Sequence, residues 1–214
     1  MSALHVFDMD GTLLRGTTAS IELSRRLDRL EPLADLEAGF AAERITAAEF
    51  AMEMRALWTE LSPELVAEVA SASPWIDGIQ EVCADIADRG ERSMLITMSP
   101  DFFAEHLLAF GVDVVAASRF PALPFAQPID TAGILEPADK VRLAEQEWIA
   151  HGLTPNDCVA YGDSMSDLPL FGVLENTVAV NADEDLERVA AIAYRGDSLL
   201  DAYALARKLL ARRL

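Results

Sequence analysis

Short apolar runs alternate with longer amphipathic stretches along most of the chain, and this alternation predicts a parallel sheet covered by helices. The expected strands are residues 3–7, 93–97, 112–116, 158–161, 177–180 and 191–194. The expected helices are residues 78–90, 101–110, 138–151 and 199–210, and a glycine ends or directly follows each of the first three. The predicted fold class is therefore α/β, with a three-layer α/β/α Rossmann-like core.

Residues 15–74 have a different pattern, with many alanines, no strand-like run and successive helix-start signals. Thr46 and Glu49 have the spacing of a capping box, and Ser62 before a proline starts a further helix. We therefore predict a small all-helical domain at 15–74, inserted after the first strand of a core made of residues 1–14 and 75–214. The least regular stretch, 118–137, is expected to form a hairpin or loop near the site.

Two carboxylates, Asp8 and Asp10, follow the first apolar run and lead into a Gly-Thr turn. Like charges this close repel unless a cation lies between them or they share a proton. The pair therefore suggests a hard divalent cation, with one oxygen left to act as a nucleophile. The alternative is a plain surface turn, because Asp-Gly is a common turn dipeptide.

Further polar residues follow other predicted strands. Asp163 and Asp167 come after 158–161, Thr97 ends the strand 93–97, and Lys140 lies in the expected first turn of a helix. In parallel sheets, ligands bind outside the carboxyl ends of the strands, where Asp8, Thr97 and Asp163 all fall. Taken alone, the threonine is explained by strand propensity and the lysine by solvation at the surface.

The order of these motifs resembles the haloacid dehalogenase-like superfamily of phosphohydrolases, and the helical insertion looks like the cap of its phosphoserine phosphatase-like branch. The resemblance spans residues 5–181 and implies a Mg²⁺ site. Its ligands would be the Asp8 side chain, the Asp10 backbone carbonyl and the Asp163 side chain. Asp167 would orient metal-bound waters or pair with Lys140.

Phosphoryl transfer requires a nucleophile, charge neutralisation and a proton for the leaving alcohol. Asp8 is the candidate nucleophile, and Asp10 is the candidate general acid and base. Thr97 and Lys140 would bind the phosphoryl oxygens. The full set of expected site residues comprises a catalytic group (Asp8, Asp10, Thr97, Lys140, Asp167), a metal group (Asp8, Asp10, Asp163) and a substrate-binding group (Thr97, Met98, Lys140, Arg55).

Asp10 favours a phosphatase of small phosphorylated metabolites over a carbon–halogen hydrolase, because the superfamily's dehalogenases lack this second aspartate. Two alternatives remain open at this stage. One is a phosphotransferase or mutase that uses the same aspartyl-phosphate, and the other is a non-catalytic phosphate-binding regulatory module.

The substrate is less well defined by the sequence. Arg55 follows Phe50 at a spacing similar to that of the substrate-carboxylate arginine of phosphoserine phosphatases, although a helix arginine paired with an acid would look the same. Those enzymes carry an amine-binding glutamate where this chain has Thr17, and Glu22 could take its place. They also carry paired glycines where this chain continues after Thr97 with Met98. Phosphoserine is therefore one candidate among small phosphomonoesters.

Charge and composition limit the kinds of binding partner and the cell compartment that we expect. The net charge of −19 argues against nucleic acid and anionic membrane surfaces, which bind basic patches. No apolar run approaches the length of a membrane span. Because Asp8 lies near the start of the sequence, we expect no signal peptide. Cys83 and Cys158 are expected to be reduced core residues, so we expect a cytoplasmic protein.

Overall fold

A six-stranded parallel sheet forms the centre of the structure, a computed structural model that describes residues 2–42 and 44–211. Residues 1, 43 and 212–214, which the predicted domain ranges include, lie outside the described residues. The strand order is β3-β2-β1-β4-β5-β6, and all the pairings are parallel, as predicted. The strands are β1 (Leu4–Phe7), β2 (Arg92–Pro100), β3 (Val114–Ser118), β4 (Cys158–Gly162), β5 (Thr177–Val180) and β6 (Ile192–Tyr194).

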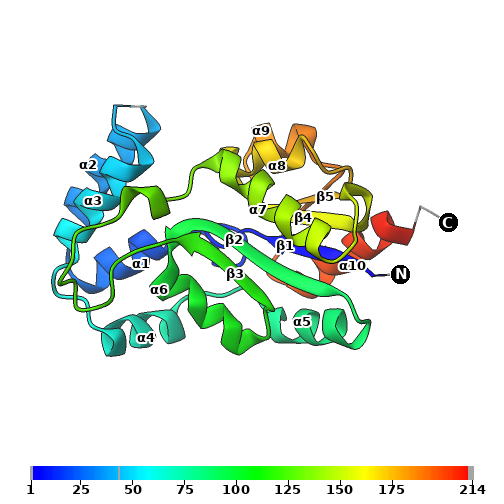
Figure 1. Cartoon of the computed structure of the whole chain (residues 1–214), viewed down its shortest axis with the longest axis horizontal. Helices are drawn as coiled ribbons and strands as arrows, with labels where there is room; N and C mark the ends of the chain where they lie inside the picture. Colours follow the sequence, from blue (N-terminus) through cyan, green and yellow to red (C-terminus); the bar gives the residue numbers. More distant parts are fainter. Residues whose placement is uncertain (1, 43, 212–214) are drawn as a thin grey trace.

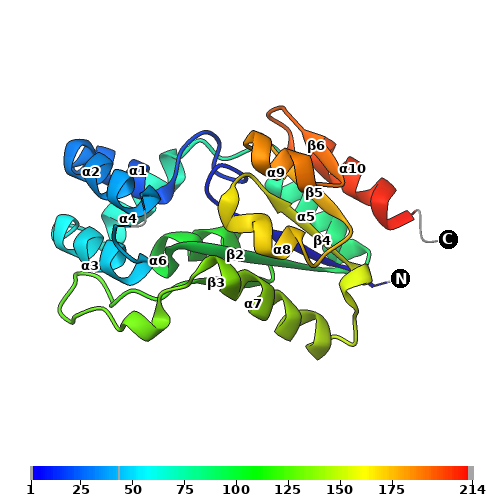
Figure 2. The ribbon, with the colours of Figure 1, turned by 90° about the horizontal axis from the view of Figure 1, so that it is seen from above.

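Helices cover both faces of the sheet, because successive side chains of each buried strand point to opposite sides. On β1, Phe7 belongs to one apolar cluster, and Leu4 and Val6 belong to the other. The Phe7 side is covered by α5 (Ile79–Asp88), α6 (Asp101–Ala104) and α10 (Leu199–Ala211). The Val6 side is covered by α7 (Pro137–Ala150), α8 (Leu168–Phe171) and α9 (Glu184–Val189), as Figures 1 and 2 show.

Four helices between β1 and α5 gather at one end of the molecule in both ribbon views (Figures 1 and 2). They are α1 (Ala19–Arg26), α2 (Leu30–Ala41), α3 (Ala47–Leu57) and α4 (Pro63–Ala72), and we call residues 15–74 the helical segment. Both bonds of the predicted capping box at Thr46 are present, and Ser62 caps α4 as predicted. The all-helical character of the insertion is confirmed, whereas its division from the core as a separate domain stays a prediction.

The region 101–110 differs from the single helix predicted for it. The α-helical part is only α6, and a tighter 3₁₀ turn, Glu105–Phe110, continues it to Gly111. Pro100 is the last residue of β2 and the N-cap of α6, because its ψ of 139° is extended. In the described stretch between β3 and α7 the chain forms a loop, one of the two predicted alternatives, and not a hairpin; its one regular element is a short 3₁₀ turn, Thr131–Gly133.

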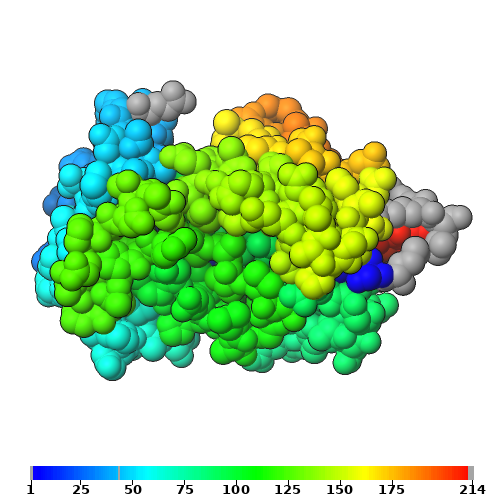
Figure 3. Space-filling model, in the orientation of Figure 1, coloured from blue at the N-terminus to red at the C-terminus, as the bar shows by residue number. Residues whose placement is uncertain are grey.

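Both cysteines are buried, Cys83 in α5 and Cys158 in β4. Within the part of the chain that the structure describes, no helix is long and apolar enough to cross a membrane. In the space-filling view, the upper edge of the molecule is notched between α2 and the region of α8 and α9 (Figure 3).

Candidate active site

The carboxyl ends of three neighbouring strands carry the predicted site residues. β1 lies between β2 and β4, and Asp8 follows β1 directly. Thr97 lies near the end of β2, and Asp163 is the first residue after β4. The Asp8 backbone N–H donates to the Tyr161 carbonyl at 2.9 Å, which continues the β1–β4 pairing up to the site.

Lys140, from the first turn of α7, is buried among acids at this edge. Its Nζ donates to Oδ1 of Asp8 and to Oδ1 of Asp167, each at 2.6 Å, and to the Ser166 hydroxyl at 3.3 Å. Burial opposes the charge of Lys140, but the two carboxylates hold its pKa above the ordinary value. Lys140 is therefore a fixed positive charge beside Asp8.

Three acids lie around Lys140, so the negative charge of their ionised forms exceeds the single positive charge of the lysine. Carboxylate oxygens of Asp8, Asp163 and Asp167 lie within 4.8 Å of one another. Burial, reinforced by Asp167, raises the pKa of Asp163 to about 7, and burial also raises the pKa of Asp8. A cation between these oxygens would stabilise their charged forms.

The oxygen donors of the cluster fit a hard divalent cation such as Mg²⁺. Oδ1 of Asp163 is buried, with no hydrogen-bond partner among the described residues. Both oxygens of Asp167 are engaged, one by Lys140 and the other by the Asp163 backbone N–H at 3.0 Å. Asp8 and Asp163 are therefore the side chains with oxygens to offer, and the Asp10 carbonyl as a third ligand stays a prediction.

Two glycines let the chain approach these acids closely. A Cβ at Gly11, whose φ of +77° favours glycine, would overlap Oδ2 of Asp163. A Cβ at Gly162 would overlap the Asp167 carboxylate. Glycine at these two positions therefore leaves the space that the Asp163 and Asp167 carboxylates occupy.

Asp10 occupies a different environment from Asp8. Its Oδ1 accepts from the Ala19 backbone N–H at 2.6 Å, and its Oδ2 accepts from the Ser99 hydroxyl at 2.7 Å and the Thr97 hydroxyl at 3.2 Å. Burial raises the pKa of Asp10, and these hydrogen bonds oppose that rise. Asp8 and Asp10 thus have different hydrogen-bond partners: Asp8 contacts Lys140, and Asp10 contacts hydroxyl and amide donors.

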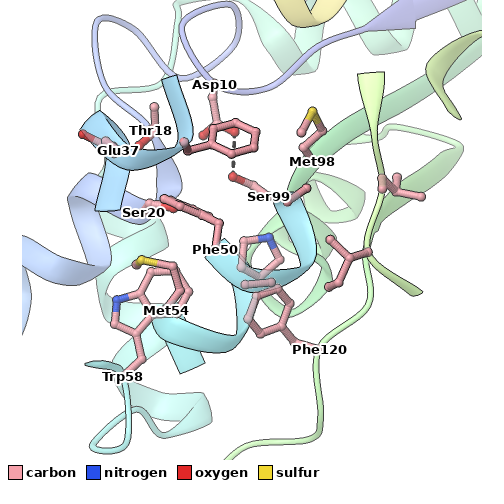
Figure 4. A pocket seen from close by; sticks show the side chains of 16 residues that line it. Asp10, Thr18, Ser20, Glu37, Phe50, Met54, Trp58, Met98, Ser99 and Phe120 are labelled. Atoms are coloured by element: carbon pink, nitrogen blue, oxygen red, sulfur yellow. Dashed lines mark hydrogen bonds between the residues drawn. The ribbon is translucent and has the colours of Figure 1, made fainter. Parts of the chain in front are cut away.

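A cavity of about 240 Å³ lies between Asp10 and the helical segment. Figure 4 shows Asp10 joined to Ser99 by a hydrogen bond, with Phe50, Met54 and Trp58 nearby on the helical segment. Phe120 lines the cavity from the loop after β3, and Met98 also lines it. The cavity is therefore largely apolar, and the candidate general acid Asp10 forms part of its wall.

Comparison with known proteins decides the family. The haloacid dehalogenase-like hydrolase family model matches residues 5–172. This chain belongs to that family. The match confirms the family and enzyme class that the sequence motifs predicted.

Known structures and sequences resemble this chain in fold or in sequence. A substrate-bound phosphoserine phosphatase structure superposes with a TM-score of 0.79 at 18% identity, covering 95% of this chain and 98% of that chain. A haloacid dehalogenase family hydrolase from Salmonella enterica serovar Typhi superposes with a TM-score of 0.82 at 16% identity, covering 94% and 71%. Phosphoserine phosphatase SerB1 of Mycobacterium tuberculosis is 27% identical over 150 residues, covering 64% of this chain and 44% of that protein. The match thus spans less than half of that curated relative.

Arg55, the predicted carboxylate ligand, does not line the cavity of this family member. Its Nε donates to the Gln127 carbonyl at 2.8 Å, and its guanidinium lies 5.7 Å from the centre of the Phe125 ring. Thr17 donates to Glu22 at 2.6 Å, and Glu22 also pairs with Arg25. The structure thus brings the core residues together and leaves these three cap residues bound to other groups.

Sequence reasoning missed several residues of the site. The Ser99 hydroxyl donates to Asp10, and the Ser166 hydroxyl accepts from Lys140, and the sequence motifs predicted neither contact. Met98 was the one apolar residue of the cavity lining among the expected site residues, and the rest of this lining was missed. A signal for it was present, because Phe50, Met54 and Trp58 follow one another at four-residue spacing and so share one side of a helix.

Proposed function

We propose that this hydrolase is a Mg²⁺-dependent phosphomonoesterase that acts on a small phosphorylated metabolite through an aspartyl-phosphate on Asp8. The observation that carries the proposal is the separation of the two aspartates. Asp8 lies 2.6 Å from Lys140 and clusters with Asp163, whose Oδ1 has no hydrogen-bond partner among the described residues. Asp10 is instead held by its own donors at the cavity. Two carboxylates in different environments suit two different roles.

In the first step, an Asp8 carboxylate oxygen attacks phosphorus, and the bond from phosphorus to the alcohol oxygen breaks. The positive charge of Lys140 beside Asp8 offsets the negative charge that gathers around the phosphoryl group. In this role Asp167, which accepts from Lys140 at 2.6 Å, is a positioning residue for the lysine.

Asp10 would move the proton in both steps. Burial raises its pKa, which favours a protonated carboxyl that can donate to the leaving alcohol. The resulting carboxylate then takes a proton from water as the water oxygen attacks phosphorus and the bond from phosphorus to Asp8 breaks. The Ser99 and Thr97 hydroxyls hold Asp10 in place through both transfers.

Mg²⁺, bound by Asp8, Asp163 and, on the resemblance, the Asp10 carbonyl, would supply charge neutralisation for the phosphoryl oxygens. The helical segment would act as a cap, because it closes the cavity beside Asp10 and can keep water from the leaving group. A phosphoserine phosphatase bearing a phospho-aspartyl intermediate analogue has the same fold, with a TM-score of 0.78 at 19% identity, which supports the proposed covalent step.

The test is Mg²⁺-dependent release of phosphate from a panel of phosphomonoesters that includes phosphoserine. We expect release that is lost on adding a chelator and lost in Asp8→Asn, with the circular dichroism spectrum unchanged. Turnover by Asp8→Asn would overturn the nucleophile assignment. Adding an acceptor alcohol separates hydrolysis from transfer, because a transferase would convert the alcohol into a new phosphate ester in place of free phosphate.

A further inference from the structure

We infer that the leaving group of the substrate is an apolar or aromatic alcohol without a carboxylate. This inference rests on the proposed phosphatase function and concerns the chemistry of the cavity beside Asp10. Sixteen residues line the cavity, and eleven of them present apolar or aromatic side chains. None of the lining residues that the structure describes is lysine, arginine or histidine.

Apart from the small Ser20 side chain, the polar groups of the lining are engaged by other residues or are acidic. The Ser99 hydroxyl donates to Asp10, and the Thr18 hydroxyl accepts from the Ile21 N–H as the N-cap of α1. The indole N–H of Trp58 donates to Ser24 at 3.0 Å, so this side chain offers the cavity only its ring. Because these three polar groups are already hydrogen-bonded within the protein, they have little capacity to bind a charged ligand.

The two ionisable groups of the lining, Asp10 and Glu37, are both acids. The Glu37 side chain makes no hydrogen bond or ion pair with another described residue, and partial burial raises its pKa. A carboxylate on the leaving group would enter this space without a cation to pair with. It would lose its hydration and lie near Glu37, the other acid of the lining, and both effects oppose binding.

The cationic side chains that could have met a carboxylate are held elsewhere. Arg55 is bound to the Gln127 carbonyl and lies over Phe125. Arg25, on α1, pairs with Glu22 and lines a separate groove on the helical segment. Arg25 is therefore paired with an acid, and Arg55 is held outside the cavity, so neither guanidinium belongs to the cavity lining.

Aromatic rings in the cavity favour an apolar leaving group. Phe40 and Phe50 lie with ring centres 5.4 Å apart, and Trp58 and Phe120 lie 6.2 Å apart. These four rings come from the helical segment and from the loop after β3, so they face the cavity from two sides. A flat or branched apolar group would bury its surface against them, whereas serine would leave them uncovered.

The first experiment compares benzyl phosphate with 4-carboxybenzyl phosphate, a pair that differs by one carboxylate, using the full chain with Mg²⁺. We expect kcat/KM to be at least tenfold higher for benzyl phosphate. Acetyl phosphate, which has only a small leaving group, reports the core chemistry. Release from acetyl phosphate with equal or reversed preference for the benzyl pair, or with phosphoserine preferred over benzyl phosphate, would overturn this inference alone. Release from none of the compounds would overturn the proposed function and this inference with it.

A charge placed in the cavity gives the second experiment. Phe50→Arg should shift the ratio of kcat/KM for the benzyl pair at least tenfold toward the carboxylated ester. Met52→Arg is the matched control, because Met52 lies on the same helix and is exposed outside the cavity. An unchanged ratio in a folded Phe50→Arg protein would overturn the inference. If that variant does not fold, the comparison on the unmodified chain still decides it.

Discussion

Gly11 lies so close to Asp163 that a single added methyl group would overlap the Asp163 carboxylate. The first motif and the loop after β4 therefore fit together only with glycine at this position. The backbone at Gly11 also has a positive φ, so both the space and the conformation exclude a larger residue.

Gly11→Ala should displace Asp163 and weaken Mg²⁺ binding at least tenfold. Gly16→Ala is the matched control, because Gly16 has a similar φ of +62° but nothing within 4 Å of the added carbon. Both variants carry the cost of a positive φ, and only the first disturbs the acids. The measurement is the Mg²⁺-induced rise in melting temperature. An equal rise in the two variants would show that Asp163 does not hold the metal.

Lys140→Met should lower the free energy of unfolding by about 3–5 kcal/mol in the absence of Mg²⁺, because it leaves Asp8 and Asp167 buried without their cation. Mg²⁺ should recover part of this loss. Lys208→Met, at an exposed position on α10, should change the free energy by less than about 0.5 kcal/mol. Urea unfolding of both variants with and without Mg²⁺ tests the prediction, and a similar small loss in both would contradict it.

Asp10→Asn should affect poor leaving groups more than good ones. A benzyl alcohol needs a proton as it leaves, so we expect a loss of about 10²-fold or more in kcat for benzyl phosphate. The 4-nitrophenolate anion leaves without a proton, so 4-nitrophenyl phosphate should lose much less in formation of the phospho-enzyme. Burst kinetics on the two esters measures this step. Equal losses would argue that Asp10 is not the acid.

Arg55→Ala separates the two roles open to this arginine. Its contacts with Gln127 and Phe125 lead us to expect the same change in KM, within about threefold, for benzyl and 4-carboxybenzyl phosphate. A rise in KM confined to the carboxylated ester would instead support the role expected from the sequence. Arg26→Ala, which removes an exposed arginine of α1, controls for the loss of a positive charge.

His5 should make stability depend on pH. It is fully buried on β1, and its two ring nitrogens lie 3.0 Å from the Tyr161 hydroxyl and 3.1 Å from Glu91. Burial lowers the pKa of His5 in the folded chain, so the neutral ring accepts from Tyr161 and donates to Glu91. The unfolded chain takes up this proton near pH 6.5 while the folded chain does not.

The contribution of His5 to stability is therefore present above about pH 6.5 and is lost as the pH falls toward the lower folded pKa. The slope is at most about 1.4 kcal/mol per pH unit, for one proton. His5→Gln should reduce the pH dependence of the free energy of unfolding between pH 7 and 5. Chemical unfolding of the unmodified chain and the variant across this pH range gives both slopes.

The sequence predicted the core well because local signals and the global fold agree there. The strands contain short apolar runs. Asp8 and Asp163 directly follow β1 and β4, and Thr97 lies near the end of β2, so the three residues meet at one edge of the sheet. The short helices α8 and α9 escaped prediction, since six residues or fewer contain too little periodicity to recognise.

The cavity could not be predicted in the same way, because its lining comes from segments far apart in the chain. Phe50 and Phe120 belong to different segments, and only the packing of the loop after β3 against α3 brings them to one space. Arg55 illustrates the limit. Its spacing from Phe50 matched a family pattern, but the loop at Gln127, which binds its guanidinium, has no recognisable signal in the sequence.

Asp10 touches both parts of the molecule at once. One of its oxygens is held by the first amide of α1, in the helical segment, and the other by Ser99 at the end of β2. If α1 moved away, the charged carboxylate would lose a donor and its affinity for a proton would rise. Protonation of Asp10 and docking of α1 are therefore thermodynamically linked. Under the proposed mechanism, the readiness of Asp10 to protonate a leaving alcohol would depend on where the first helix lies.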